Sequence, residues 1–345
     1  MPGEPLKTPR ATEDRLENLR EEARRTGHVA ATGIPIVGGP IPRDAASASG
    51  YYGQPIVKPP VWTWQIGLYL FVGGTAGMSG AIALAGLLTG QPLDFVHPAL
   101  GVAFAGALIS PVLLIWDLGR PTRFLNMLRV FKWRSAMSMG VWTLFLFSGF
   151  AGAAFVLVTA WDVLLQWGVP PTALRGIALT LVAGTALSGV ILATYTGVLL
   201  GATAVPVWSA HHKLLPFHFG IAGLGSAAAI LELLGFRLAA LNAIAMTVAA
   251  VETGISVWIE FGRQGATARA IHEGTPGRLL RAAALLTGPV PLILRIFDLV
   301  PIAGVCFLVG AVSSRYGWVM AGRFSARDPE EIIASQKGMR DHESR

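Results

Sequence analysis

Four segments of the 345-residue chain place polar and titratable residues inside an otherwise apolar sequence. They read VWTWQIGLYLFVGGTAG from residue 61, WDLGRPTRFLNMLRVFKWRSAMSMGVW from residue 116, TYTGVLLGATAVPVWSAHH from residue 194 and LLPFHFG from residue 214. Their hydroxyl and amide groups can donate hydrogen bonds to a ligand, and their carboxylates and imidazoles can transfer protons. These segments are therefore the candidate functional site.

Three residues of these segments are expected to lie inside helices. Tyr195 precedes Pro206 by eleven residues, roughly 16 Å along a helix, and a hydroxyl at that depth needs a polar partner. Gln65 and Tyr69 are four residues apart and share one helix face. Each of the three can contact a ligand. A plain interhelical hydrogen bond remains the alternative for Tyr195, and an interfacial position remains the alternative for Tyr69.

Two acidic residues interrupt apolar stretches. Glu252 lies nine residues inside the end of its stretch, roughly 14 Å along a helix and near mid-membrane. An intramembrane carboxylate is a functional candidate by default. Glu252 can belong to a proton path, or it can be protonated and bonded to Thr253 or to a neighbouring helix. Glu232 lies only a few residues from a membrane face, and we expect water at the boundary to solvate it.

Further titratable residues stand at the expected helix ends. Asp117 and Arg120 are three residues apart and can form a local salt bridge that ends a helix, or Asp117 can also relay protons. His211 and His212 are adjacent at the boundary, where one of them could deliver a proton. His97 lies near the opposite boundary from His218, so these two imidazoles cannot share a haem iron.

The composition determines the kind of element that must position these residues. Hydrophobic residues make up 53% of the chain and charged residues 14%, with a mean hydropathy of +0.56. Soluble domains carry about 25% charged residues, so a soluble globular enzyme is excluded. The single cysteine, Cys306, excludes a disulfide framework and an iron–sulfur cluster ligated by this chain alone. The sequence predicts an all-α polytopic membrane protein.

Eight apolar stretches have lengths suited to the hydrocarbon core of a membrane, roughly 20 residues each. They cover about 62–88, 95–116, 137–160, 175–203, 214–235, 238–261, 279–297 and 299–320. We therefore expect a membrane domain at 62–322. It follows an extended N-terminal tail at 1–61, which contains a short charged helix and contacts a partner. A polar C-terminal tail at 323–345 completes the chain.

An even number of helices places both termini on one side of the membrane, here called face S. Face S also receives the loops at 117–136, 204–213 and 262–278. Of the 27 lysines and arginines, all but Arg175, Arg237 and Arg295 are expected on this side. By the positive-inside rule, face S and both termini are cytoplasmic, and the chain is a multi-pass protein of a bacterial inner membrane. The net charge of +7 then reflects topology rather than nucleic-acid binding.

The four segments resemble the NrfD/PsrC family, the membrane subunits of polysulfide-reductase-type complexes. The resemblance rests on Asp-Leu-Gly-Arg-Pro from Asp117, on Ser-x-Met-Ser-x-Gly-x-Trp from Ser135, and on Tyr-Thr-Gly followed by Pro-x-Trp at 195–208. It covers roughly residues 60–320. Ser209 departs from the pattern, because the family often has Asn after the Trp.

The resemblance implies eight transmembrane helices in two four-helix bundles and a bound quinone, either menaquinone or ubiquinone. It implies no haem or iron–sulfur cluster in this chain. The expected partners are a ferredoxin-like iron–sulfur subunit and a molybdopterin-type catalytic subunit. Residues expected to bind the quinone are Gln65, Tyr69, Arg120, Tyr195 and Trp208. Residues expected to handle protons are Asp117, His211, His212 and Glu252.

The first interpretation is therefore a quinone-binding membrane subunit of a multisubunit oxidoreductase, without substrate turnover of its own and with proton translocation as an added option. The alternative is a proton or ion channel, or a transporter, that works without redox partners. In that case Glu252 and the glycine-rich first helix would form the pathway. Under the first interpretation, loss of the Tyr195 hydroxyl should damage activity most. Under the alternative, loss of the Glu252 carboxylate should do so.

Overall fold

The computed structural model describes residues 62–118, 126–262, 267–328 and 332. Contacts divide the chain into two units, Met1–Pro55 and Ile56–Arg345, and the first unit lies wholly outside the described residues. The predicted N-terminal tail, Arg120 and most of the predicted C-terminal tail lie outside the described residues.

The described part of the chain is helical and contains no β-strand. Eight segments in it are long and apolar enough to cross a membrane, which confirms the all-α polytopic class. They are α2 (Trp64–Leu88), α3 (Leu93–Leu118), α5 (Ala136–Thr159), α7 (Pro171–Gly201), α9 (Leu214–Leu233), α10 (Ala239–Phe261), α12 with α13 (Gly274–Thr287 and Pro289–Ile296) and α14 (Val300–Ser325). Short helices α6 (Trp161–Gln166), α8 (Pro206–Ala210) and α11 (Ala268–His272) connect them.

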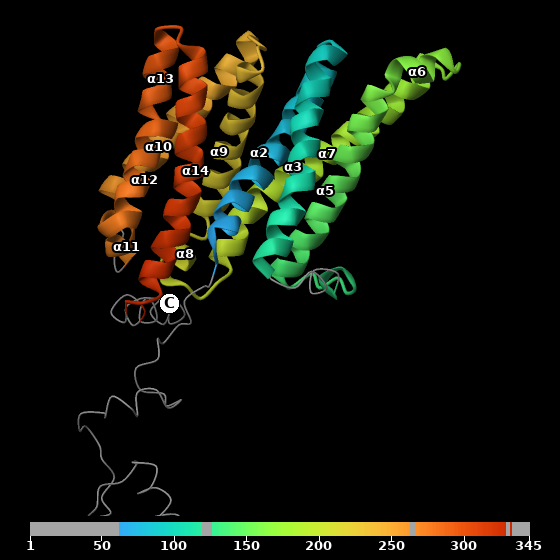
Figure 1. The fold of residues 1–345 in the computed structure, drawn as a ribbon. Coiled ribbons are helices and arrows are strands. Elements are labelled where there is room, and N and C mark those ends of the chain that lie inside the picture. The colour runs from blue at the N-terminus through green and yellow to red at the C-terminus, as the bar shows by residue number, and fades with distance from the viewer. Residues whose placement is uncertain (1–61, 119–125, 263–266, 329–331, 333–345) are drawn as a thin grey trace, which may run out of the picture. The chain divides into compact units, whose positions relative to one another are not determined.

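The long helices alternate in direction, so their ends gather on two sides. Figure 1 shows the start of α2, the end of α14 and the short helices α8 and α11 at one side, with α6 at the other. The first side is face S. All four segments with candidate residues reach this side, because odd-numbered spans begin there and even-numbered spans end there.

Helix contacts group the spans by sequence order. Helices α2, α3, α5 and α7 pack on one another, and α9, α10, α12, α13 and α14 do the same. Helices α2 and α7 also pack against α9. The division into two four-helix bundles therefore stays a prediction.

Glycines allow a close approach between α2 and α7. A Cβ atom on Gly189 would lie 2.8 Å from the Cα atom of Gly77, which is backbone and cannot rotate away. On the other side of α2, a Cβ atom on Gly223 of α9 would lie 2.8 Å from the Gly74 carbonyl oxygen. Small residues are the usual means by which membrane helices approach closely, and here they hold α2 against α7 and α9.

The seventh span is broken in its middle. Gly288 leaves the helical conformation (φ −106°, ψ −101°) between α12 and α13. Pro289 and Pro291 follow it, and neither has a backbone N–H to continue the helical ladder. A Cβ atom on Gly288 would lie 2.6 Å from the Thr253 hydroxyl oxygen on α10, so a side chain would not fit here. The span begins at Gly274, five residues before the predicted 279.

Two predictions about charged residues are wrong. Glu232 is not solvated at the boundary: it is 6% exposed, and its carboxylate accepts hydrogen bonds from both terminal nitrogens of Arg295, one at 2.8 Å. Arg295 also donates to the Asn242 side chain at 2.6 Å. Arg315, counted above as a face-S charge, is 1% exposed within α14, because its guanidinium packs against Phe219 of α9. Helix α14 also continues to Ser325 instead of ending at 320.

Candidate functional site

A cavity of about 80 Å³ opens among the face-S ends of α2, α3, α5 and α7. Two tyrosines and one carboxylate are set into a mostly apolar wall. The lining residues are Trp62, Ile66, Tyr69, Leu114, Asp117, Met127, Met137, Gly140, Val141, Tyr195 and Leu199. Ligand sites for small molecules commonly have this make-up, an apolar slot with a few placed polar groups.

Tyr195 reaches across from α7 to the start of α5. Its hydroxyl donates a hydrogen bond to the Ala136 carbonyl oxygen, and the side chain is 8% exposed. Gly140 makes this position possible, because a Cβ atom there would occupy the space of the Tyr195 ring. The hydroxyl proton is committed to Ala136, so towards a ligand the Tyr195 oxygen is available as an acceptor.

Tyr69 presents the other hydroxyl of the cavity. Its side chain is 2% exposed and lines the same space as Tyr195. Within the described residues its hydroxyl has no hydrogen-bond partner, although such groups normally find one when buried. A ligand carbonyl in the cavity would give Tyr69 the acceptor it lacks.

Asp117 ties the end of α3 to the start of α2. Its carboxylate accepts hydrogen bonds from the Thr63 hydroxyl at 2.8 Å and from the Thr63 backbone N–H at 3.4 Å. The Thr63 hydroxyl also lies against the Gln65 side-chain oxygen. Asp117 thus orders the entrance of the cavity while also lining it. Gln65 is 8% exposed and lies outside the lining set.

Trp208 supports the cavity from behind. Its indole N–H donates to the Trp318 carbonyl oxygen at 2.7 Å, and its ring stacks on Trp62 with 5.0 Å between the centroids. Trp208 is fully buried, whereas Trp62 lines the cavity. The indole N–H of Trp208 is therefore already hydrogen-bonded, and Trp208 supports the cavity by packing against Trp62.

His211 and His212 line a different, open cavity of about 490 Å³, which also includes Lys213, Phe217 and Trp258. The His211 ring nitrogen Nδ1 contacts the Val207 carbonyl oxygen at 2.8 Å, and the corresponding nitrogen of His212 contacts the Ser209 carbonyl oxygen at 2.9 Å. The structure does not bring this pair into the tyrosine cavity.

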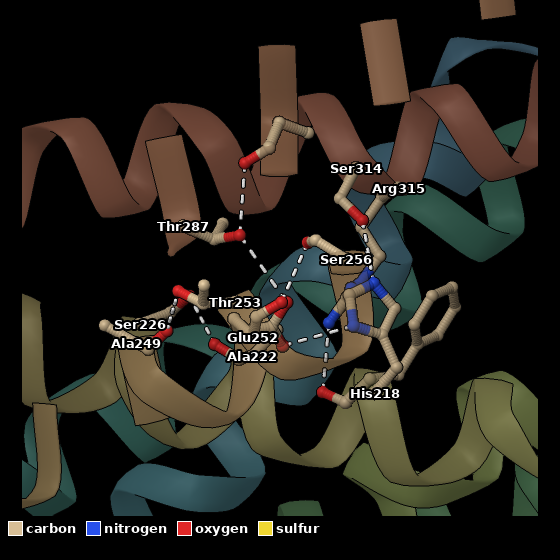
Figure 2. Close-up of polar contacts among 12 residues, drawn as sticks. His218, Ala222, Ser226, Ala249, Glu252, Thr253, Ser256, Thr287, Ser314 and Arg315 are labelled. Carbon is tan, nitrogen blue, oxygen red and sulfur yellow. Dashed lines mark hydrogen bonds and ion pairs between the residues drawn. The ribbon is translucent and has the colours of Figure 1, made fainter. Parts of the chain in front are cut away.

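Glu252 belongs to a third group of residues. It is 1% exposed and meets His218 of α9 and Thr287 of α12 (Figure 2). His97 instead contacts the Thr159 hydroxyl at 3.0 Å, near the face opposite S. The structure thus separates Glu252 from Tyr69 and Tyr195.

Several contributors to these sites were not predicted from the sequence. Trp62, Met127, Met137 and Gly140 line the tyrosine cavity, and the quoted motifs contain all four without indicating which face each occupies. His218 was considered only as a haem ligand. Its place four residues inside an apolar helix was the available signal of a buried polar partner.

Fold and site define the class of this molecule, a polytopic α-helical membrane protein with a hydroxyl-bearing cavity at one membrane boundary. The model of the family described as polysulphide reductase, NrfD, matches residues 55–262, and the chain belongs to this family. The C subunit of the polysulfide reductase of Wolinella succinogenes is 38% identical over 92 residues, which are 25% of this chain and 28% of that protein. The match thus spans little more than a quarter of that relative.

Proposed function

We propose that this chain is the quinone-binding membrane subunit of a multisubunit oxidoreductase. In this role it exchanges electrons between the membrane quinone pool and an iron–sulfur partner subunit, which in turn serves a molybdopterin-type catalytic subunit. The observation that carries the proposal is the position of Tyr69, a 2% exposed residue on the wall of an apolar cavity at face S, whose hydroxyl makes no hydrogen bond among the described residues. The family to which the chain belongs supports the same assignment.

The residues of the cavity suit a quinone headgroup. A bound quinone accepts two electrons and two protons when it is reduced to a quinol. Tyr69 would donate a hydrogen bond to one ring carbonyl, and the Tyr195 oxygen would accept one from the quinol hydroxyl. Ile66, Leu114 and Leu199 supply apolar wall for the ring and the start of the tail.

Asp117 is the proton-transfer group that this proposal places at the cavity. It lies at the face-S end of α3, and Thr63 holds its carboxylate towards α2. A carboxylate at this position can pass protons between the boundary and the headgroup. His211 and His212 lie on another cavity. A proton from either of them would therefore pass through Asp117 before it reaches the headgroup.

Exchanging Tyr69 for phenylalanine tests the proposal directly. The change removes one hydroxyl and keeps the aromatic ring, so we expect its main effect on a ligand in the cavity. Loss of one hydrogen bond of about 1–1.5 kcal/mol corresponds to roughly a tenfold lower kcat/KM for the quinone. The measurement is quinone-dependent electron transfer in the assembled complex, at several quinone concentrations.

Tyr316→Phe is the matched control, because Tyr316 is also a tyrosine near face S but donates to the Trp64 carbonyl oxygen outside the cavity. Tyr195→Phe should also slow the reaction, with an added structural cost at Ala136. Unchanged quinone kinetics in both Tyr69→Phe and Tyr195→Phe, with normal subunit content, would contradict the assignment of this cavity as the quinone site.

A further inference from the structure

His218 connects two helices through both of its ring nitrogens. Nδ1 lies 3.1 Å from the Glu252 carboxylate on α10, and Nε2 lies 3.0 Å from the Ser314 hydroxyl on α14. Figure 2 shows the imidazole between these two groups, with Thr287 on the other side of the carboxylate. His218, Glu252 and Ser314 are each at most 5% exposed. This group of three is called the imidazole cluster below.

The imidazole cluster fits two protonation states without moving a side chain. When the imidazole is neutral with its proton on Nδ1, it donates to Glu252, and the Ser314 hydroxyl donates to Nε2. When the imidazole is protonated, Nε2 donates to the Ser314 oxygen instead, because a hydroxyl both donates and accepts. One added proton therefore requires only a rotation of the Ser314 hydroxyl.

A small cavity of about 50 Å³ leads from the imidazole cluster towards face S. It lies between α10, α12 and α14, and Ser256, Ile259, Ala284 and Trp318 contribute to its wall. Glu260 and Arg281, which also line it, lie near the face-S ends of α10 and α12. The cavity thus joins buried titratable groups to the membrane boundary.

Other charged groups around the imidazole cluster come from several helices. Arg315 of α14 is 1% exposed, donates to the Phe219 carbonyl oxygen at 3.0 Å and interacts electrostatically with Glu252. Towards face S, Glu260 pairs with His272 of α11 at 3.4 Å. His211 and His218 both lie against the Trp318 ring. Arg315 therefore adds a positive charge beside the imidazole cluster.

Two further observations mark this position as a site. The Nε and one terminal nitrogen of Arg315 are buried without a partner among the described residues, and bound water is the usual means of satisfying such groups. The break of the seventh span at Gly288 directly follows Thr287, which donates to Glu252 at 3.5 Å. Interrupted helices in membranes are tolerated where they line a polar site.

We propose that His218 and Glu252 form a binding site for one exchangeable proton, reached from face S through the cavity between α10 and α12. A proton suits the site better than a metal cation, because the guanidinium of Arg315 and the imidazole of His218 leave little net negative charge. The proposal rests on the imidazole cluster and its cavity, and it does not depend on quinone binding at the tyrosine cavity.

Cysteine accessibility tests the route. In a Cys306→Ala background, Ala284→Cys places a thiol on the cavity wall and Leu285→Cys places one at the same depth on the exposed side of α12. A small, charged, membrane-impermeant thiol reagent added at face S of sealed vesicles should label the first at least roughly tenfold faster than the second. Equal labelling of the two, or faster labelling from the opposite face, would overturn the route.

Infrared spectroscopy tests the proton. The full chain in lipid nanodiscs should give a pH-difference spectrum with coupled imidazole and carboxyl bands, and both Glu252→Gln and His218→Gln should lose them. Asp94→Asn, which removes an exposed carboxylate at the start of α3, is the control and should keep them. Retention of these bands in a folded Glu252→Gln variant would overturn the proposal, with folding checked by helix content and elution volume.

Discussion

Replacing Arg295 with methionine is expected to lower the free energy of unfolding by about 3–5 kcal/mol. Arg295 holds Glu232 with two hydrogen bonds, and both side chains are only 2% exposed. Removing the guanidinium leaves a carboxylate, and the Asn242 oxygen, without their donor inside the membrane domain. The measurement is reversible denaturation in mixed micelles, followed by circular dichroism.

Two variants make the Arg295 experiment specific. Arg237→Met removes an exposed arginine near the same membrane face and should change stability by less than about 0.5 kcal/mol. The double variant Arg295→Met with Glu232→Gln removes both charges and should recover a large part of the loss, because no unpaired charge remains. A loss of under about 1 kcal/mol in the single variant would contradict a stabilising role of this pair.

Exchanging Gly189 for alanine is expected to cost about 1–3 kcal/mol of stability and to weaken quinone binding at the proposed site. The added Cβ atom would lie 2.8 Å from the Gly77 Cα atom, so α7 must move away from α2. Tyr195 lies six residues further along α7, and Tyr69 lies on α2. Separating these helices therefore widens the cavity between the two hydroxyls.

Gly176→Ala is the matched control, since it lies on the same helix and a Cβ atom there meets nothing within 4 Å. Alanine is favoured over glycine in a helix by about 1 kcal/mol, so this variant should be neutral or slightly stabilising. The readouts are thermal unfolding and the KM for quinone in the assembled complex. Equal stability of the two variants would show that the close contact between α2 and α7 is not required.

The membrane fold was largely predictable because the hydrocarbon core imposes length and composition on each span. The prediction of eight spans is confirmed, and most of the predicted ends agree with the observed helices to within a few residues. The end of α14 was missed because Arg315 and Arg323 read as boundary charges. Hydropathy averages a helix around its axis, so it cannot tell that Arg315 faces the Phe219 ring at 3.8 Å rather than water.

The residues of the candidate site could be predicted from the sequence. Which of them share one cavity was harder to predict. The motifs indicated Tyr69, Tyr195 and Asp117, and the structure places these three on one cavity. His211 and His212 were grouped with them because all lie at face S, yet they line a separate cavity. Depth along a helix follows from residue counting, whereas the rotation of each helix about its axis does not.

The amino-acid sequence was enough to predict the membrane class, the number of spans, the shared face of the four candidate segments and the family resemblance. Each of these depends on composition or on spacing along the chain, and neither requires knowledge of how the helices pack. The pairing of Glu232 with Arg295, and the position of His218 between Glu252 and Ser314, became visible only in the folded molecule. The paired residues are 34 to 96 positions apart in the sequence. Their contacts therefore depend on how the helices pack and on how each helix is rotated about its axis.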